Sequence, residues 1–339
     1  MTPTLEKLNK DLLPEVEKEL QHTVSLASSN ETQELHNMLA YHMGWEGEGA
    51  GPDASGKRIR PILLLLTTGA AQGEWQDALP AAAAVELVHN FSLIHDDIED
   101  NSPLRRGRPT LWKLWGVPQA INCGDTTLTL ANLSILRLSE RTNTAIAYQA
   151  TKILQETCLL LTQGQYLDLS YESVAKLTVN EYWPMIRGKT AALIGACTEL
   201  GALIANTSTA ARKSYRDFGT SLGMAFQVQD DLLGIWGDAD LTGKSIESDL
   251  VTGKKSLPVL YGLSQGGTFA SRWRKGAILP QEVPYLAQEL ENEGARDYTN
   301  RFASQYTQHA LDSLKKADPK GEFGEGLVEL ADSLLNRSR

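Results

Sequence analysis

The sequence predicts an all-α protein, a single large helical bundle formed by residues 1–339. Nearly every periodic segment repeats its apolar residues at helical spacing, and no alternating run of β-branched residues competes with this pattern. The residues suited to metal or phosphate chemistry lie between Lys57 and Lys255, and no linker divides them. Because 42% of the 339 residues are hydrophobic, the chain can bury a sizeable core. We therefore expect one domain, with its functional motifs at residues 56–258.

The expected helices follow one another with short breaks. The first is amphipathic, and Pro14 is expected to interrupt it. A glycine-rich loop, GWEGEGAGPDASG, leads to a buried helix that starts near Pro61. Further helices are expected at residues 32–42, 87–100, 120–138, 145–171, 179–205 and 215–235, and over several stretches between 257 and 339.

Charge and cysteine content narrow the class of protein. The formal net charge of −10 argues against general nucleic-acid binding. Cys123, Cys158 and Cys197 lie in apolar contexts without metal-ligand spacing, so we interpret them as reduced core residues of a cytoplasmic protein. No apolar run is long enough to span a bilayer, and no signal segment is evident.

Four carboxylates end the buried helix within the stretch LVHNFSLIHDDIEDNSPLRRGR at residues 87–108. On helical spacing Asp96 and Asp100 share a face, Asp97 flanks it, and His89 lies two turns below. Because Asp96, Asp97, Glu99 and Asp100 repel one another, they favour a hard divalent cation such as Mg²⁺ between them. A solvated acidic helix end is the alternative.

Two groups of basic residues accompany this acidic cluster. One follows it directly, at Arg105, Arg106 and Arg108. The other precedes the helix that starts near Pro61, at Lys57, Arg58 and Arg60. Guanidinium groups suit phosphate oxygens, and a helix N-terminus also favours anions. The first group, beside the carboxylates, suggests a diphosphate site. The second is a candidate for a second anion pocket, although it could also be structural or solvated.

Polar residues interrupt two of the later apolar helices. Gln165 and Asp168 are three residues apart on one helix and share a face. They are suited either to structural pairing or to a site. Lys189 and Thr190 interrupt the apolar surface of the helix at 179–205. Lys189 could extend outward to solvent or point inward at a phosphate.

A second acidic helix end occurs at Asp230 and Asp231, with Gln227 one turn earlier on the same face. Two apolar helices that end in carboxylates suggest a cavity between them with metal at its mouth. Coincidental acidic helix ends are the alternative. The following loop contains Lys244 and Lys254, together with Asp238, Asp249 and Lys255. Its glycines suit a lid over a polyphosphate, and a solvated loop is the alternative.

These motifs, read in order, resemble the trans-isoprenyl diphosphate synthases, or polyprenyl synthetases, of the class I isoprenoid synthase fold. The resemblance runs from about Leu35 to Leu263 and includes GKRIRP, DDIED, RRGRPTLW, GQYLDL, GKT and FQVQDD. A single DDxxD is a weak signal, whereas the ordered set is specific. The resemblance implies head-to-tail condensation of isopentenyl diphosphate with dimethylallyl, geranyl or farnesyl diphosphate. It also implies a central apolar cavity, three Mg²⁺ ions with Mn²⁺ as a substitute, and a homodimer.

The resemblance assigns roles to individual residues. The implied metal ligands are Asp96, Asp97, Asp100, Asp230 and Asp231, supported by Gln165 and Asp168. The implied contacts of the allylic diphosphate are Arg105, Lys189 and Lys244, and Lys254 is a further candidate for substrate binding. The implied contacts of isopentenyl diphosphate are Lys57, Arg60, His89 and Arg106. Thr190 and Gln227 would face the developing allylic cation.

One position departs from the family pattern. The second motif is commonly DDxxD, but Gly234 here replaces its last aspartate. Asp238 or Asp249 could support the metal through water instead. The departure weakens the assignment at this position alone, because Asp230 is the direct ligand expected there.

The residues before the first motif bear on product length. Phe91, five residues before Asp96, with the small Ser92 after it and no insertion in DDIED, resembles the pattern of geranylgeranyl diphosphate synthases. On an ideal helix, however, Ser92 and Val88 lie nearer than Phe91 to the carboxylate face. A farnesyl or longer product remains an alternative. A class I terpene cyclase, a silent partner subunit, and transfer to another acceptor are rival functions.

Overall fold

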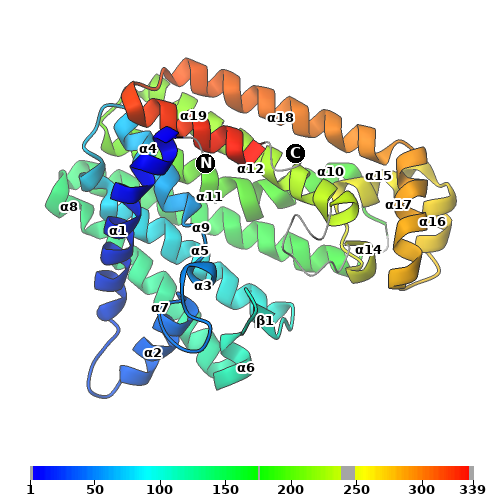
Figure 1. The fold of residues 1–339 in the computed structure, drawn as a ribbon, viewed down its shortest axis with the longest axis horizontal. Coiled ribbons are helices and arrows are strands. Elements are labelled where there is room, and N and C mark those ends of the chain that lie inside the picture. The colour runs from blue at the N-terminus through cyan, green and yellow to red at the C-terminus, as the bar shows by residue number, and fades with distance from the viewer. Residues whose placement is uncertain (1–2, 175, 238–248, 336–339) are drawn as a thin grey trace. The chain divides into compact units, whose positions relative to one another are not determined.

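The chain folds almost entirely into helices (Figure 1). The structure, a computed structural model, describes residues 3–174, 176–237 and 249–335. Two short strands, β1 (Leu104–Arg105) and β2 (Arg108–Pro109), pair as an antiparallel hairpin that the sequence pattern did not predict. The all-α prediction is confirmed. Among the described residues, no helix is long and apolar enough to cross a membrane.

Contacts within the chain divide it into two compact units. The first unit consists of the residues up to Glu156 together with Cys197–Arg212 and Asp318–Glu329. The second consists of Thr157–Ala196, Lys213–Ala317 and the residues from Leu330 onward. Four helices have residues in both units: α9 (Thr144–Glu172), α11 (Ala192–Ile204), α12 (Thr209–Trp236) and α19 (Gly321–Leu335). The expectation of a single domain stays a prediction.

The first unit is organised around α4 and α5. Besides the hairpin, the described elements that lie wholly within this unit are α1 (Pro3–Ser25), α2 (Gln33–His42), α3 (Pro52–Ser55), α4 (Ile59–Ala70), the 3₁₀ turn η1 (Trp75–Ala78), α5 (Leu79–Glu99), α6 (Leu111–Trp115), α7 (Val117–Leu136) and α8 (Leu138–Arg141). The leucines at 63–66 of α4 are fully buried, as are the alanines at 81–84 of α5. Helix α5 packs along α7, where Gly124 leaves room for the His95 ring. This packing holds the acidic end of α5 on a buried, well-fixed helix.

The second unit contains two apolar clusters. Its remaining elements are α10 (Val179–Ile186), the π-helical turn η2 (Arg187–Ala191), α14 (Asp249–Thr252), α15 (Leu257–Gln265), α16 (Thr268–Trp273), the 3₁₀ turn η3 (Pro280–Glu282), α17 (Val283–Asn292) and α18 (Ala295–Ala317). Tyr182, Met224 and Leu257 belong to the first cluster. Ile235 and Phe269 belong to the second. The acidic end of α12 therefore emerges from packed core.

Two helical predictions were wrong in detail. Helix α1 runs without a break through Pro14. Pro14 is exposed, so the carbonyl that loses its partner can face water, and the buried stripe of α1 keeps the helix continuous. The helix expected at 179–205 is instead α10, η2 and α11. The π-helical turn coincides with the Gly-Lys-Thr motif, and such turns are frequent at functional sites.

Candidate active site

Backbone hydrogen bonds satisfy the C-terminal end of α5, where the acidic residues lie. Asn101 adopts a left-handed conformation, with φ of 51°. The amide of Ser102 then donates to the Asp97 carbonyl, and that of Asn101 donates to the Ile98 carbonyl. This Schellman arrangement satisfies the last carbonyls without using side chains. Asp100 still donates its amide to the Asp96 carbonyl, so these two carboxylates keep the one-turn spacing that the sequence predicted.

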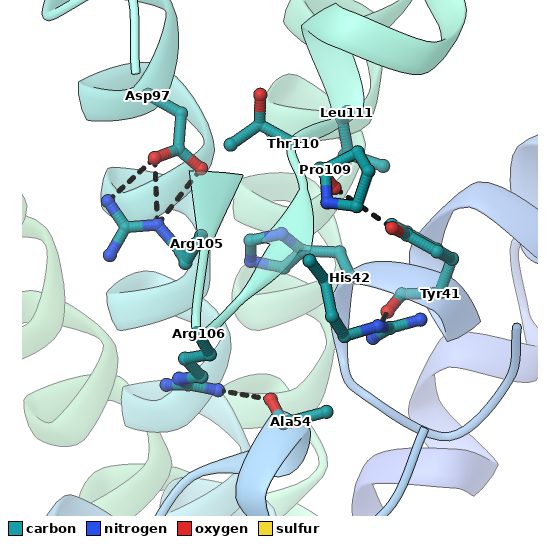
Figure 2. Close-up of a pocket in the computed structure, with 10 residues that line it drawn as sticks. Tyr41, His42, Ala54, Asp97, Arg105, Arg106, Pro109, Thr110 and Leu111 are labelled. Carbon is teal, nitrogen blue, oxygen red and sulfur yellow. Dashed lines mark hydrogen bonds and ion pairs between the residues drawn. The ribbon is translucent and has the colours of Figure 1, made fainter. Parts of the chain in front are cut away.

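Asp97 forms an ion pair with Arg105 of the hairpin. Arg105 Nε lies 2.8 and 2.9 Å from the two Asp97 oxygens, and Arg105 Nη2 lies 2.8 Å from Asp97 Oδ1 (Figure 2). Burial raises the pKa of the Asp97 carboxyl, and Arg105 opposes that rise. Asp97 and Arg105, predicted to contact metal and diphosphate, therefore neutralise each other here.

The hairpin that carries the arginines turns through two residues with positive φ. Arg106 has φ of 51° and Gly107 has φ of 75°, which together suit a tight hairpin turn. Arg106 Nη1 donates to the Ala54 carbonyl across 2.7 Å (Figure 2). The guanidinium lies over Gly56, where a Cβ would come within 2.6 Å of Nη2, and burial lowers the pKa of Arg106. Left-handed backbone at a non-glycine residue is strained, which is common at binding sites.

Arg108, by contrast, is a structural residue, and its inclusion among the phosphate-binding arginines was wrong. Its side chain is buried and donates to the carbonyls of Glu48, Tyr41 and Glu46 at 2.9, 2.8 and 2.6 Å. It also stacks on the Tyr41 ring at 3.9 Å from the ring centroid. Each of the three guanidinium nitrogens donates to a backbone carbonyl, so Arg108 fastens the loop after α2 to the hairpin.

The basic residues at the start of α4 also separate. Arg58 is 3% exposed and donates to Glu17 at 2.6 Å and to Glu86 at 2.9 Å, so it is structural. Lys57 is exposed. The Nε of Arg60 is buried without a hydrogen-bond partner among the described residues. An unsatisfied buried guanidinium nitrogen is consistent with a site for an anion.

Two histidines stand among these cations. Burial and the nearby Arg60 lower the pKa of His89 well below its usual range. Burial, aided by Arg105 and Arg106, lowers the pKa of His42 to about 3. His42 lines the same pocket as the two hairpin arginines (Figure 2) and was missed from the sequence. Nothing in a lone histidine at the end of α2 distinguishes it from a surface residue.

The three residues considered for product length divide between two faces of α5. Phe91 packs on His95, with ring centroids 4.8 Å apart, and His95 fits against Gly124 of α7. Val88 is fully buried. Ser92 donates to the His89 carbonyl at 2.8 Å, and it lies one turn before Asp96 on the carboxylate side. Phe91 is thus on the α7 side of the helix.

In the second unit, close backbone contact positions Lys189. Gly164 of α9 touches Gly188 of η2 so closely that a Cβ on either glycine would collide with backbone atoms of the other segment. Asp168 is one turn beyond Gly164, and its Oδ2 lies 2.5 Å from Lys189 Nζ. The lysine therefore points inward at a carboxylate, which settles the alternative of outward extension.

The next residue, Thr190, begins a chain of side-chain hydrogen bonds. Its hydroxyl donates to Gln227 Oε1 at 2.8 Å, and Gln227 Nε2 donates to Asp231 Oδ1 at 3.0 Å. Asp231 Oδ2 accepts from the Tyr182 hydroxyl at 2.7 Å and from the Leu257 amide at 2.9 Å. Burial raises the pKa of Asp231, whereas Lys254 and these donors oppose the rise. Asp231 is thus engaged on both oxygens.

The lysines of the following loop have different partners. Desolvation lowers the pKa of Lys254, but Asp231, Asp249 and Asp230 outweigh it and raise that pKa, although the side chain keeps exposed surface. Lys255 Nζ instead donates to the carbonyls of Tyr171, Glu172 and Val174 and so caps α9. Lys244 and Asp238 lie outside the described residues.

Comparison with known proteins shows to which family a chain with these motifs belongs. The polyprenyl synthetase family model matches residues 51–275. The chain belongs to the polyprenyl synthetase family. It is 37% identical over 317 residues to a geranylgeranyl diphosphate synthase of Mycobacterium tuberculosis, with 91% of this chain and 90% of that protein covered.

Two further relatives illustrate the range of the family. A (2E,6E)-farnesyl diphosphate synthase of the same organism is 36% identical over 313 residues, with 89% of this chain and 86% of that protein covered. A crystal structure of a polyprenyl synthetase from Streptomyces coelicolor A3(2) has a TM-score of 0.85 at 34% identity, with 98% of each chain covered. Overall similarity therefore supports the family more strongly than any one product.

The structure explains why glycine replaces the last aspartate of the second polyprenyl synthetase motif. A Cβ on Gly234 would lie 2.5 Å from Asp249 Oδ2. The Asp249 carboxyl thus occupies the space that a side chain at position 234 would need. Burial raises its pKa to about 6, Lys254 opposes this, and Asp231 and Asp230 add to it. Glycine at position 234 therefore leaves the space that the Asp249 carboxyl group fills.

The donor set fits the hard divalent cation that the polyprenyl synthetase family implies. In each unit by itself, one helix supplies carboxylate oxygens, which Mg²⁺ prefers. Asp249 Oδ2 is buried and accepts no hydrogen bond from the part of the chain that is described. No three histidine, cysteine or acidic side chains of that part already converge as a metal site.

Proposed function

We propose that this polyprenyl synthetase condenses isopentenyl diphosphate with an allylic diphosphate and releases geranylgeranyl diphosphate. The observation that carries the proposal is the pairing of acid and base within each unit. Asp97 meets Arg105 in the first unit, and Asp168 meets Lys189 in the second. Carboxylates for a metal beside cations for phosphate are what diphosphate ionisation requires. The named relatives support the same reaction.

The residues divide the work of the reaction. Asp96, Asp100 and Asp230 are proposed as direct Mg²⁺ ligands, and the metal roles of Asp97 and Asp231 stay predictions. When bound, Mg²⁺ acts as a Lewis acid on the leaving diphosphate. Arg105, Lys189 and Lys254 hold the allylic diphosphate, a role that Lys244 is predicted to share. Lys57, Arg60, His89 and Arg106 hold isopentenyl diphosphate.

The bond changes follow from this placement. The C1–O bond of the allylic substrate breaks, and its electron pair leaves with the diphosphate. Thr190 and Gln227 present oxygen atoms to the allylic cation. The double bond of isopentenyl diphosphate attacks C1, and a proton passes to the departing diphosphate. The predicted apolar cavity would exclude water, which would otherwise capture the cation.

Product analysis tests the proposal. Purified protein is incubated with Mg²⁺, isopentenyl diphosphate, and dimethylallyl, geranyl or farnesyl diphosphate in separate reactions, and the products are identified by mass spectrometry. Geranylgeranyl diphosphate as the common end product is expected. A farnesyl or longer end product would keep the enzyme class and overturn the product assignment. Absence of condensation with every primer would refute the synthase function.

The Phe91→Ala variant is expected to make longer prenyl diphosphates than the wild-type protein. Removing the ring from the His95 side of α5 frees volume beside the helix on which the first motif is carried. Mass spectrometry of the end products measures the shift. Tyr148→Ala, which truncates an exposed aromatic residue of α9, serves as the control and should leave the products unchanged. An unaltered product from Phe91→Ala would place the floor of the cavity elsewhere.

We propose that the chain forms a homodimer through the exposed face of α7. Val117, Ile121, Leu133 and Leu136 are 40–51% exposed there, and symmetric dimers are the commonest oligomers. Ile121→Glu is expected to yield a monomer by sedimentation equilibrium, because it places a charge in an apolar contact. Val328→Glu, at an exposed apolar position on α19, is the matched control. A dimer that survives Ile121→Glu would exclude this face.

A further inference from the structure

Asp231 is buried and has more hydrogen-bond partners within the protein than a metal ligand would need. It is 1% exposed and accepts hydrogen bonds from three elements: α10 through Tyr182, α12 through Gln227, and α15 through the Leu257 amide. Tyr182 is also 1% exposed. All of these residues lie in the second unit. The carboxyl group is therefore held from three sides within packed core.

This arrangement determines which way the Gln227 amide points. Both Asp231 oxygens accept hydrogen bonds, and Gln227 Nε2 donates to Oδ1, so the NH₂ group of Gln227 faces Asp231. Its carbonyl oxygen then faces Thr190, whose hydroxyl donates to it at 2.8 Å. The Thr190 hydroxyl hydrogen is thereby committed to Gln227, and the lone pairs of Thr190 Oγ1 are directed away from it.

We propose that Tyr182 and Asp231 are positioning residues that orient Gln227 and, through it, Thr190 toward the allylic cation. The inference rests on the proposed synthase function and extends it to two residues that need not touch substrate. Tyr182 holds the Asp231 carboxylate, Asp231 selects the amide orientation, and the oriented oxygens of Gln227 and Thr190 stabilise positive charge at the reacting carbon. Preorganised dipoles of this kind act on the chemical step more than on substrate binding.

The test compares two tyrosine variants in the full-length protein. Tyr182→Phe keeps the ring and removes the hydroxyl. Tyr215→Phe removes a hydroxyl from an equally buried tyrosine on α12, about 18 Å along the helix from Gln227. We expect kcat to fall about ten-fold in Tyr182→Phe, the typical effect of one hydrogen bond to a charged group. KM for both substrates and the Mg²⁺ activation constant should stay within two-fold of wild type.

A double-mutant cycle identifies the route of the effect. Because Tyr182 acts through Gln227 and Thr190, its substitution should cost little further activity in a Thr190→Val background. Additive losses in the double variant would overturn the inference. So would an unchanged kcat in Tyr182→Phe, or an equal loss in Tyr215→Phe.

A second variant separates positioning from metal binding. Asp231→Asn keeps the shape of the side chain but no longer selects the Gln227 orientation, so kcat should fall while the Mg²⁺ activation constant changes less than in Asp230→Asn. An equal rise of that constant in both variants would make Asp231 a metal ligand and overturn the inference. This variant also serves if Tyr182→Phe does not fold. A wild-type protein that makes no prenyl diphosphate would refute the proposed function itself.

Discussion

Replacing Asp96 by Asn is expected to lower the condensation rate about 1000-fold or more, which corresponds to roughly 4 kcal/mol of transition-state stabilisation. The carboxylate is proposed to bind the metal that absorbs the charge of the departing diphosphate. Its loss should not unfold α5, because backbone contacts from Asn101 and Ser102 close that helix. Single-turnover rates and binding of Mn²⁺ in the presence of diphosphate, followed by electron paramagnetic resonance, measure both aspects.

The matched control for this variant is Glu99→Gln. Glu99 belongs to the same acidic cluster and is exposed, but it is not among the proposed metal ligands. Its substitution should change the rate less than three-fold, because it alters the charge of the cluster without removing a ligand. Equal losses in the two variants would mean that the general acidity of the helix end matters rather than a specific ligand. More than a tenth of wild-type activity in Asp96→Asn would remove Asp96 from the metal site.

Replacing Arg58 by Met is expected to lower the free energy of unfolding by about 3–5 kcal/mol, the usual cost of removing one partner from a buried ion pair. The guanidinium is 3% exposed and bridges Glu17 and Glu86, and it also donates to the Met43 carbonyl at 3.2 Å. Methionine fills similar space, so the loss reflects the uncompensated Glu86 carboxylate rather than a cavity. Urea unfolding followed by tryptophan fluorescence measures the change.

Two further variants make the stability experiment specific. Lys7→Gln breaks an exposed ion pair, in which Lys7 Nζ lies 2.6 Å from Glu322, and should lower the stability far less than Arg58→Met does. Arg58→Met combined with Glu86→Gln should recover part of the loss, because the second substitution removes the stranded charge. An Arg58→Met protein as stable as wild type would contradict the structural role. It would then return Arg58 to the candidates for binding anions.

The helical class, the acidic helix ends and their order along the chain were predictable because they are local patterns. Apolar periodicity reports which side of a helix is buried, and α9 lies within one residue of its expected bounds. Helices α5 and α12 end within one residue of their expected ends but begin eight and six residues earlier than expected. Asp96 and Asp100 share a face because a helix places residues four apart on one side. Gly234 was recognisable as a departure from the second motif. These properties depend on neighbours in sequence, and the sequence alone determined them.

Partner choice among like residues was decided by the tertiary structure. Arg58 and Arg60 are equivalent in the sequence, yet Arg58 forms an ion pair with Glu17, which is 41 residues away. Lys254 faces carboxylates whereas Lys255 caps α9. Tyr182 meets Asp231 across 49 residues. No periodicity encodes such contacts, because a charged or polar side chain is satisfied by whichever distant groups the packed helices bring within hydrogen-bonding distance.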